Sequence, residues 1–219
     1  VVGNIRQSGA PKRYHERVLK DLAQHHVCNA ASLKEQLVRD YGLPPERVSV
    51  ILNGVDVERF RPDKAAKSQP PVLLSAGRLI PDKDQATLLR AFARVARQVP
   101  DVRLQLFGDG PLRQELQEQV GAMPPDVAAR ITLACGREGL ETLYPAATVF
   151  VLSSVREGLP NVILEAMASG LPVAATAVDG IPELVAHKET GLLVPPGNDQ
   201  ALAAALLELL QDPQRCAAM

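Results

Sequence analysis

The sequence predicts an α/β fold built around a doubly wound parallel sheet. From residue 72 onwards, short apolar runs alternate with longer segments whose apolar residues recur at helical spacing. Gly and Pro residues separate these segments. Aromatic residues make up only 3% of the chain, so Val, Leu, Ile and Ala must build the core, which suits strands buried on both faces. Strands alternating with helices form right-handed βαβ units and therefore a mostly parallel sheet.

The charge balance and the cysteines exclude several functional classes. The chain has 24 Lys plus Arg against 25 Asp plus Glu, a net charge of −1, which argues against a general attraction to nucleic acid or anionic membranes. No apolar run approaches the roughly 18–20 residues of a membrane span. Cys28, Cys135 and Cys216 lie far apart without a C-x-x-C pair, so neither a disulfide framework nor a zinc site is expected, and a reducing cytoplasm fits best.

Residues 1–60 precede the regular alternation. Pro11 opens a predicted helix over 11–24, and Ser32 with Glu35 forms a predicted capping box at the start of a second helix, which Gly42 ends. The other expected features are a short apolar stretch over 26–29, a strand over 47–52, a turn at 53–54 and a Pro-rich linker over 61–71.

Five strands are then expected to alternate with five helices. The strands cover 72–76, 102–107, 131–134, 148–152 and 173–176, and the helices cover 84–99, 111–120, 138–146, 160–169 and 199–211. Ligands of such sheets bind at the carboxyl ends of the strands, near the switch in strand order. The loops over 77–84, 108–111, 135–139, 153–160 and 177–182 are therefore where a site is expected.

The first of these loops, GRLIPDKD, places Arg78 and Lys83 between a strand and a helix. A guanidinium offers phosphate a two-pronged set of N–H donors, and an ammonium adds a mobile point charge. Two cations beside a helix start predict a diphosphate site, with two solvated side chains as the alternative. The next loop, FGDGP, indicates a structural turn. It lacks the third Gly of a dinucleotide fingerprint, which disfavours nicotinamide and flavin enzymes.

The segment over 156–172, REGLPNVILEAMASGLP, carries the strongest signal. Glu157 lies just before a helix expected from Pro160, and Glu165 lies on that helix. Backbone N–H groups at the helix start form an anion site. Carboxylates beside it suit a nucleotide sugar, because Glu165 would accept from ribose hydroxyls and Glu157 from sugar hydroxyls. Two solvated or paired glutamates are the alternative for an isolated E-x7-E spacing.

Residues 157–172 resemble the donor-site signature of retaining nucleotide-sugar glycosyltransferases of the group 1, glycogen-synthase-like family. Four more segments resemble that family in order and spacing: NGVDVERFRP (53–62), GRLIPDKD (77–84), LFGDGP (106–111) and TGLLVPPGN (190–198). The resemblance extends over about residues 27–211. It implies a Rossmann-like doubly wound sheet forming the C-terminal half of a GT-B fold.

The resemblance also implies a role for each matched residue. Arg78 and Lys83 match the cations on the donor diphosphate, and Glu157 matches the glutamate near the transferred sugar; these three are the expected catalytic residues. Among the other expected substrate-binding residues, Glu165 matches the glutamate on the ribose, and Arg137 matches a position whose backbone lies near the nucleobase. Gly158, Leu159 and Pro160 match the stretch whose backbone faces the sugar and phosphate. Asn161 replaces the Gly of the commoner E-G-F-G form.

The implied activity is transfer of a hexose-type sugar from a nucleoside-diphosphate sugar to a glycan, glycolipid or small molecule, with retention of configuration. Cations and helix-start amides would stabilise the leaving diphosphate, so no cofactor and no metal site is expected. Same-face attack and a covalent intermediate on Glu157 both remain open. The alternatives are a nucleotide-sugar 2-epimerase of GT-B architecture and a donor-binding module that is inactive alone.

The segment NGVDVERFRP (53–62) resembles the family's interdomain junction, and its position in the chain bears on domain organisation. It follows too little chain for a whole first domain, and the chain begins at Val1 rather than Met. We therefore expect residues 1–60 to be the end of an N-terminal acceptor domain with the interdomain junction. Residues 61–219 are then a donor domain without its final crossover helix.

The expected partners are a nucleotide sugar and an acceptor of open identity, without nucleic acid or a transmembrane segment. Self-association through uncovered apolar surface is also expected. The expected location is cytoplasmic, with a peripheral position at the inner membrane face of a full-length protein as an option.

Overall fold

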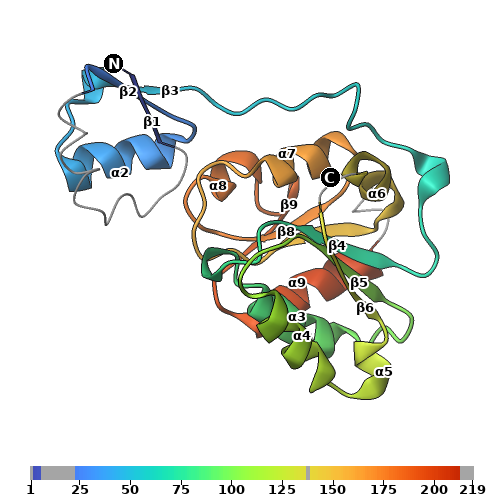
Figure 1. Cartoon of the computed structure of the whole chain (residues 1–219). Helices are drawn as coiled ribbons and strands as arrows, with labels where there is room; N and C mark the ends of the chain where they lie inside the picture. Colours follow the sequence, from blue (N-terminus) through green and yellow to red (C-terminus); the bar gives the residue numbers. More distant parts are fainter. Residues whose placement is uncertain (1, 6–22, 137–138, 213–219) are drawn as a thin grey trace.

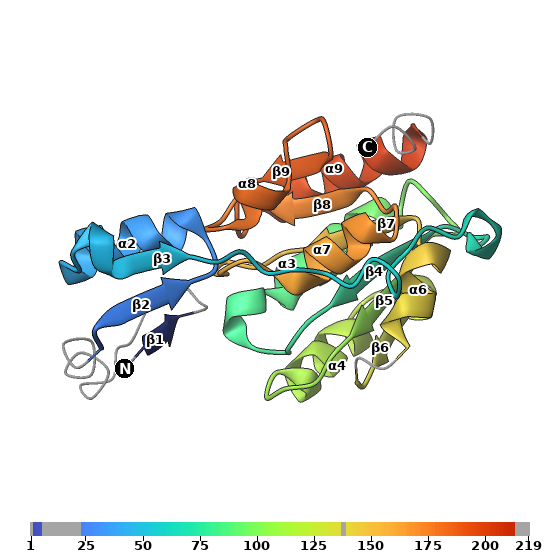
Figure 2. The same ribbon diagram turned by 90° about the horizontal axis from the view of Figure 1, so that it is seen from above.

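The computed structural model describes residues 2–5, 23–136 and 139–212. Within these ranges the chain forms two parallel sheets (Figure 1). A three-stranded sheet has the order β1-β2-β3, and a six-stranded sheet has the order β6-β5-β4-β7-β8-β9. The three-stranded sheet and α2, together called the small module below, lie beside one end of the large sheet (Figures 1 and 2).

The large sheet is doubly wound. Its strands are β4 (Val72–Ala76), β5 (Arg103–Phe107), β6 (Ile131–Ala134), β7 (Val149–Leu152), β8 (Val173–Thr176) and β9 (Gly191–Val194), all paired in parallel. Counted from β4, the order is 3-2-1-4-5-6, and the direction of winding reverses between β4 and β7. The predicted Rossmann-like sheet is confirmed. β9 lies within 190–198, where only the family resemblance indicated a strand.

Helices cover both faces of the large sheet, so alternate strand residues are buried in different layers. In β4, Leu73 packs into one layer and Leu74 into the other. The first layer contains α3 (Gln85–Val95), α4 (Arg113–Gly121), α5 (Pro125–Ala128) and α9 (Asp199–Gln211), and the second contains α6 (Leu140–Ala146), α7 (Asn161–Ala168) and α8 (Ile181–Leu184). The predicted helices of this region are present with shifted ends. α3 stops at Val95, earlier than predicted, because the chain approaches Pro100, which disfavours helix in the residue before it.

The small module contains β1 (Val2–Ile5), β2 (His25–Cys28), α2 (Ala31–Tyr41) and β3 (Val48–Val50). The strand predicted over 47–52 is shorter, because a 3-10 turn occupies Pro45–Arg47 and the exposed residues after Val50 leave the sheet. Gly42 closes α2 in the left-handed conformation, as predicted. Residues 11–22 of the predicted first helix lie outside the described residues.

The capping box predicted at Ser32 and Glu35 is wrong. The helix begins at Ala31, and its N-cap residue, Ala30, has no side-chain hydrogen bond to offer. The first N–H groups of α2 instead donate to a carboxylate 152 residues away, that of Glu183 on α8: Ala31 N lies 2.7 Å from Oε2 and Ser32 N lies 2.8 Å from Oε1. A local sequence pattern could not reveal a cap supplied from so far along the chain.

The segment between the two sheets, residues 51–71 (the junction segment), has no strand; it contains a turn over 57–59 and a 3-10 turn at Lys64–Ala66. Its part over 61–71 is the predicted linker. The junction segment runs over α7 in both views (Figures 1 and 2). It is also attached to the large sheet's helices. Phe60 is buried among them, Arg59 pairs with Glu141 at 2.9 Å, and the backbone N–H of Ser68 donates to the carbonyl of Ala146 at 2.9 Å.

No described helix is both long enough and apolar enough to cross a membrane.

Gly191 provides a test of strand packing in the large sheet. A Cβ at this position would lie 2.4 Å from the carbonyl oxygen of Val173 on β8 and 2.8 Å from Cγ1 of Val185. We expect Gly191→Ala to lower the free energy of unfolding in urea by about 1–3 kcal/mol, the usual cost of overpacking. Gly121→Ala is the control, because its Cβ would meet nothing within 4 Å. Equal stability of the two variants would contradict this packing.

Candidate donor site at the switch point

The candidate site lies where the winding direction of the large sheet reverses. The β4 loop (Gly77–Asp84) and the β7 loop (Ser153–Pro160) leave the carboxyl ends of neighbouring strands. The two loops are hydrogen-bonded to each other: Ser153 Oγ donates to the carbonyls of Lys83 and Asp84 at 3.0 and 2.9 Å, and Val155 N donates to the carbonyl of Asp82 at 2.9 Å. The three expected catalytic residues, Arg78, Lys83 and Glu157, lie on these same loops.

A buried ion pair joins Lys83 of the β4 loop to Glu157 of the β7 loop. The two side chains are only 14% and 7% exposed. Ser154 Oγ also donates to Oε1 of Glu157 at 2.7 Å, and Asp179 Oδ2 accepts from the Glu157 backbone N–H at 2.8 Å. The sequence predicted separate roles for Lys83 and Glu157; the structure brings them into direct contact, so each supplies the other's countercharge.

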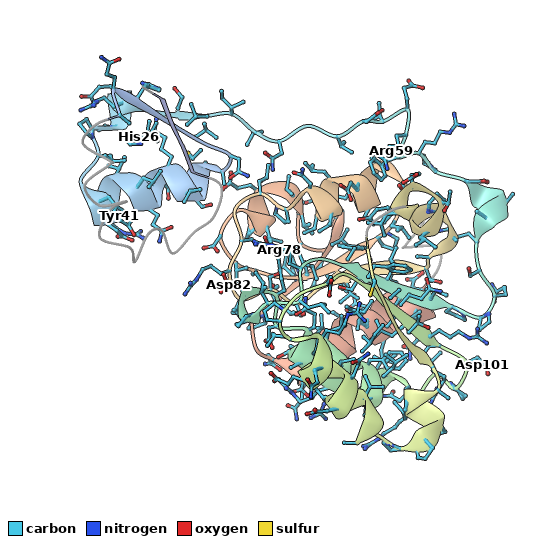
Figure 3. All side chains as sticks on the ribbon, viewed as in Figure 1. His26, Tyr41, Arg59, Arg78, Asp82 and Asp101 are labelled. Atoms are coloured by element: carbon cyan, nitrogen blue, oxygen red, sulfur yellow. The ribbon has the colours of Figure 1, made fainter. Side chains whose placement is uncertain are left out.

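Arg78 is held by its backbone and exposes its side chain. Gln85, buried at the start of α3, donates from Nε2 to the Arg78 carbonyl at 2.8 Å. The Arg78 guanidinium has no ion-pair partner among the residues that the structure describes. Arg78 and Asp82 lie at the end of the large sheet that faces the small module (Figure 3). A bidentate donor at that edge is available to an incoming anion.

The residues before α7 are fixed from several directions. Gly158, Leu159 and Pro160 are buried, and α7 begins at Asn161, one residue after the predicted start. Asn53 Nδ2 donates to the Leu159 carbonyl and to Asn161 Oδ1, both at 2.7 Å. The backbone that the sequence assigned to the sugar and phosphate is therefore anchored by the junction segment.

On its other side this backbone lies against Gly180. A Cβ on Gly180 would fall 2.3 Å from the Gly158 carbonyl oxygen and 3.0 Å from the Cβ of Ala30 in the small module. Leu159 is buried in the small module's core, with Cys28, Ala30 and Leu33. The β7 loop therefore separates the two modules and contacts both.

Glu165 lies one turn into α7, half-buried, where Tyr144 donates a hydrogen bond to its Oε2 at 2.8 Å. Arg137 falls outside the described residues, so the structure places neither its backbone nor its side chain. Sequence reasoning missed Asn53, Tyr144, Asp179 and Glu183. Asn53 and Asp179 lay in segments already singled out, but nothing in the pattern indicated what they contact.

The expectation of no metal site assumed that the donor loops lack a D-x-D motif, and that assumption is wrong: Asp82 and Asp84 form a D-x-D sequence around Lys83, a pattern that can hold a metal ion. Asp84 caps α3, since its carboxylate accepts from Thr87 N at 3.2 Å and from Thr87 Oγ1 at 2.6 Å. Asp82 pairs with Arg156, with 3.9 Å between its Oδ1 and Nη1 of the guanidinium. Across the part of the chain that the structure describes, no group of three or more His, Cys, Asp and Glu residues is arranged to hold a metal ion.

Two family models match the chain. The model described as "Glycosyl transferases group 1" matches residues 56–219, and the model described as "Glycosyltransferase Family 4" matches residues 4–59. The first match covers most of the chain, including the β4 and β7 loops and α7.

Curated relatives agree with these matches. A D-inositol 3-phosphate glycosyltransferase from Thermobispora bispora is 33% identical over 93% of this chain and 52% of its own length. A GDP-mannose-dependent alpha-(1-6)-phosphatidylinositol monomannoside mannosyltransferase from Mycolicibacterium smegmatis is 35% identical over 76% of this chain and 48% of its own. The chain thus spans about half the length of these relatives.

Solved structures show the same fold. Anabaena Alr3699/HepE in complex with UDP-glucose has a TM-score of 0.87 and 26% identity, over 99% of this chain and 64% of that chain. Sucrose-phosphate synthase from Thermosynechococcus elongatus has a TM-score of 0.82 and 30% identity, over 93% of this chain and 53% of that one.

The Glu183 cap gives the contact between the modules a pH dependence. Burial alone would raise the pKa of Glu183, but hydrogen bonds from the N–H groups of Ser32 and Ala31 outweigh it and hold the pKa below its ordinary value. A lowered carboxyl pKa contributes stability that is complete above about pH 4.5 and is lost as the pH falls below it. We expect Glu183→Gln to be less stable than wild type in urea at pH 7, with the difference shrinking below about pH 4.5.

Glu189→Gln, a change to an exposed carboxylate nearby, is the matched control and should show little difference at either pH. If Glu183→Gln lowers the free energy of unfolding by the same amount at pH 7 and at pH 4, the charge of Glu183 is not what stabilises the start of α2.

Proposed function

This chain belongs to the family of group 1 glycosyl transferases, and we propose that it forms the donor site of an enzyme that transfers a hexose-type sugar from a nucleoside-diphosphate sugar to an acceptor with retention of configuration. The observation that carries the proposal is the Lys83–Glu157 pair, held between the β4 and β7 loops at the switch point of the large sheet. Cation, carboxylate and helix start come together at the edge where doubly wound sheets bind their ligands.

The leaving diphosphate is the group that this site is best suited to stabilise. A lysine ammonium has three N–H donors, so Lys83 can hold Glu157 and a phosphate oxygen together. Arg78 adds an exposed guanidinium, and α7 begins at Asn161, directly after the β7 loop, with no side chain capping its first N–H groups. As the bond between sugar and diphosphate breaks, these donors stabilise the charge that develops on the leaving oxygen.

Glu157 is the proposed catalytic carboxylate. Its Oε1 accepts hydrogen bonds from Lys83 and from Ser154, and its remaining acceptor positions suit sugar hydroxyls. In a same-face attack it would orient the sugar while the bond from the anomeric carbon to the diphosphate oxygen breaks, the acceptor oxygen bonds to that carbon, and the acceptor's proton passes to the departing diphosphate oxygen. The alternative, in which Glu157 itself bonds to that carbon, would require its carboxylate to leave the ion pair.

The division of the chain and the acceptor belong to the same proposal. Residues 1–60 would be the end of an acceptor-binding domain with its junction, and residues 61–219 the donor domain. The relatives' names include inositol phosphate and phosphatidylinositol acceptors, and one solved neighbour is a complex with UDP-glucose. These names support a nucleotide-sugar donor for this chain and leave its base, its sugar and its acceptor as questions for assay. Self-association and a cytoplasmic location stay predictions.

The proposed phosphate contacts are tested by titration calorimetry with UDP, GDP and ADP. We expect the wild-type chain to bind at least one of them, and Arg78→Ala and Lys83→Ala each to weaken that binding about tenfold or more, the loss expected for a charge-assisted hydrogen bond. Arg97→Ala removes an exposed cation just beyond α3 and should change little. Unchanged affinity in both site variants would refute the assignment. Thermal melting of each variant separates a folding defect from lost binding.

Retention and independence from metal are tested by transfer assays on the full-length gene product with UDP-, GDP- and ADP-sugars. We expect a glycosylated acceptor whose anomeric configuration, read by NMR, equals that of the donor, and unchanged turnover in EDTA. An inverted product would contradict retention, and loss of turnover in EDTA with rescue by a divalent ion would contradict the metal-free mechanism.

A free epimerised nucleotide sugar would instead identify an epimerase, and binding without turnover would favour a donor-binding module.

A further inference from the structure

Tyr144 is a fully buried tyrosine whose hydroxyl donates to Glu165, the residue expected to bind the ribose. It lies in α6, is 0% exposed, and donates its hydroxyl hydrogen to Glu165 Oε2 at 2.8 Å. α6 and α7 pack beside each other on the same face of the large sheet (Figure 1). A buried tyrosine hydroxyl normally needs a hydrogen-bond partner, and here that partner is the carboxylate expected to bind the ribose.

Aromatic contacts on two sides hold the Tyr144 ring in place. Phe60 of the junction segment makes an edge-to-face contact with a ring-centroid distance of 5.8 Å, and Phe150 of β7 lies at 5.6 Å. Phe60 is itself covered by the guanidinium of Arg59, 5.2 Å from the ring centroid, and Arg59 pairs with Glu141. Because the ring is packed in this way, the position of its hydroxyl oxygen beside Glu165 is fixed.

A fixed hydroxyl restricts what the Glu165 carboxylate can do. A carboxylate has about four acceptor positions on its two oxygens and, on a flexible side chain, can turn them in many directions. With one oxygen hydrogen-bonded to Tyr144, rotation of the group is limited and its remaining acceptor positions keep one orientation. A ribose presents two neighbouring hydroxyl donors, and an oriented carboxylate accepts from such a pair better than a mobile one.

We propose that Tyr144 is a positioning residue that orients Glu165 toward the ribose hydroxyls, and that the site thereby selects ribonucleoside diphosphates over their deoxy counterparts. The inference rests on the proposed function, since it takes Glu165 as the ribose contact. It adds a second residue, on another helix, that determines which nucleotides are accepted without touching them.

The test compares the affinity for a ribonucleotide with that for its 2′-deoxy and 3′-deoxy forms. The ligand is whichever of UDP, GDP and ADP the wild-type chain binds most tightly in titration calorimetry. We expect Tyr144→Phe, which keeps the ring and loses the hydroxyl, to reduce the ribo-to-deoxy affinity ratio about tenfold, chiefly by weakening the ribonucleotide. Tyr41→Phe on α2 removes a tyrosine hydroxyl from the small module and should leave the ratio unchanged.

A double-mutant cycle shows whether Tyr144 acts through Glu165. Glu165→Gln should lower the same ratio, and adding Tyr144→Phe to it should lower the ratio no further. A general loss of packing would weaken ribo and deoxy ligands equally, so a constant ratio in Tyr144→Phe overturns the inference while leaving the proposed function in place. Independent effects of the two changes would overturn it as well. If the wild-type chain binds none of the three nucleotides, both the proposed function and this inference fail.

Discussion

The Lys83–Glu157 ion pair is the interaction on which the arrangement of the site depends. Its two residues are 74 positions apart in the chain, but the loops that carry them leave strands that are neighbours in the sheet. Removing one partner from a buried pair leaves an uncompensated charge, which is strongly destabilising, so each residue requires the other. Ser153, which bonds the carbonyls of Lys83 and Asp84, and Asp179, which accepts from Glu157 N, hold the backbones on either side of the pair. Two side chains that would each be costly to bury alone thus compensate each other at the edge where ligands bind.

The junction segment supports the site rather than merely connecting two sheets. Asn53 holds the carbonyl of Leu159, and Phe60 packs against Tyr144, which orients Glu165. These contacts lie at the start of α7 and one turn further along it. A chain segment rich in Pro and charge would be expected to form an extended, semi-rigid spacer between domains. Here it is held at intervals by hydrogen bonds and one buried aromatic ring, so its position is part of the geometry of the donor site.

The sequence predicted the large sheet well because its signals are local. Apolar runs, helical periodicity and Gly or Pro punctuation fixed the strands from Val72 to Thr176, and the loops after β4 and β7 followed from the topology. The loop residues Arg78, Lys83 and Glu157 were also identified from the sequence. Their pairing was not, because it depends on the register of β4 against β7. The capping box at Ser32 failed for a similar reason, since tertiary contact with Glu183 decides where α2 begins.

Leu159 shows why the two modules cannot be treated as independent. Its carbonyl is bonded by Asn53, while its side chain lies in the small module's core beside Leu33 and Ala30. The adjacent Gly158 carbonyl leaves no room for a Cβ on Gly180. Any displacement of the β7 loop would therefore disturb the packing of the small module, and a shift of the small module would move the backbone that leads into α7. Suppose that a ligand binds one position of the β7 loop more tightly than another. By linkage, it then stabilises the contact between the modules that accompanies that position, and the free energy of stabilisation equals the difference in its binding free energies.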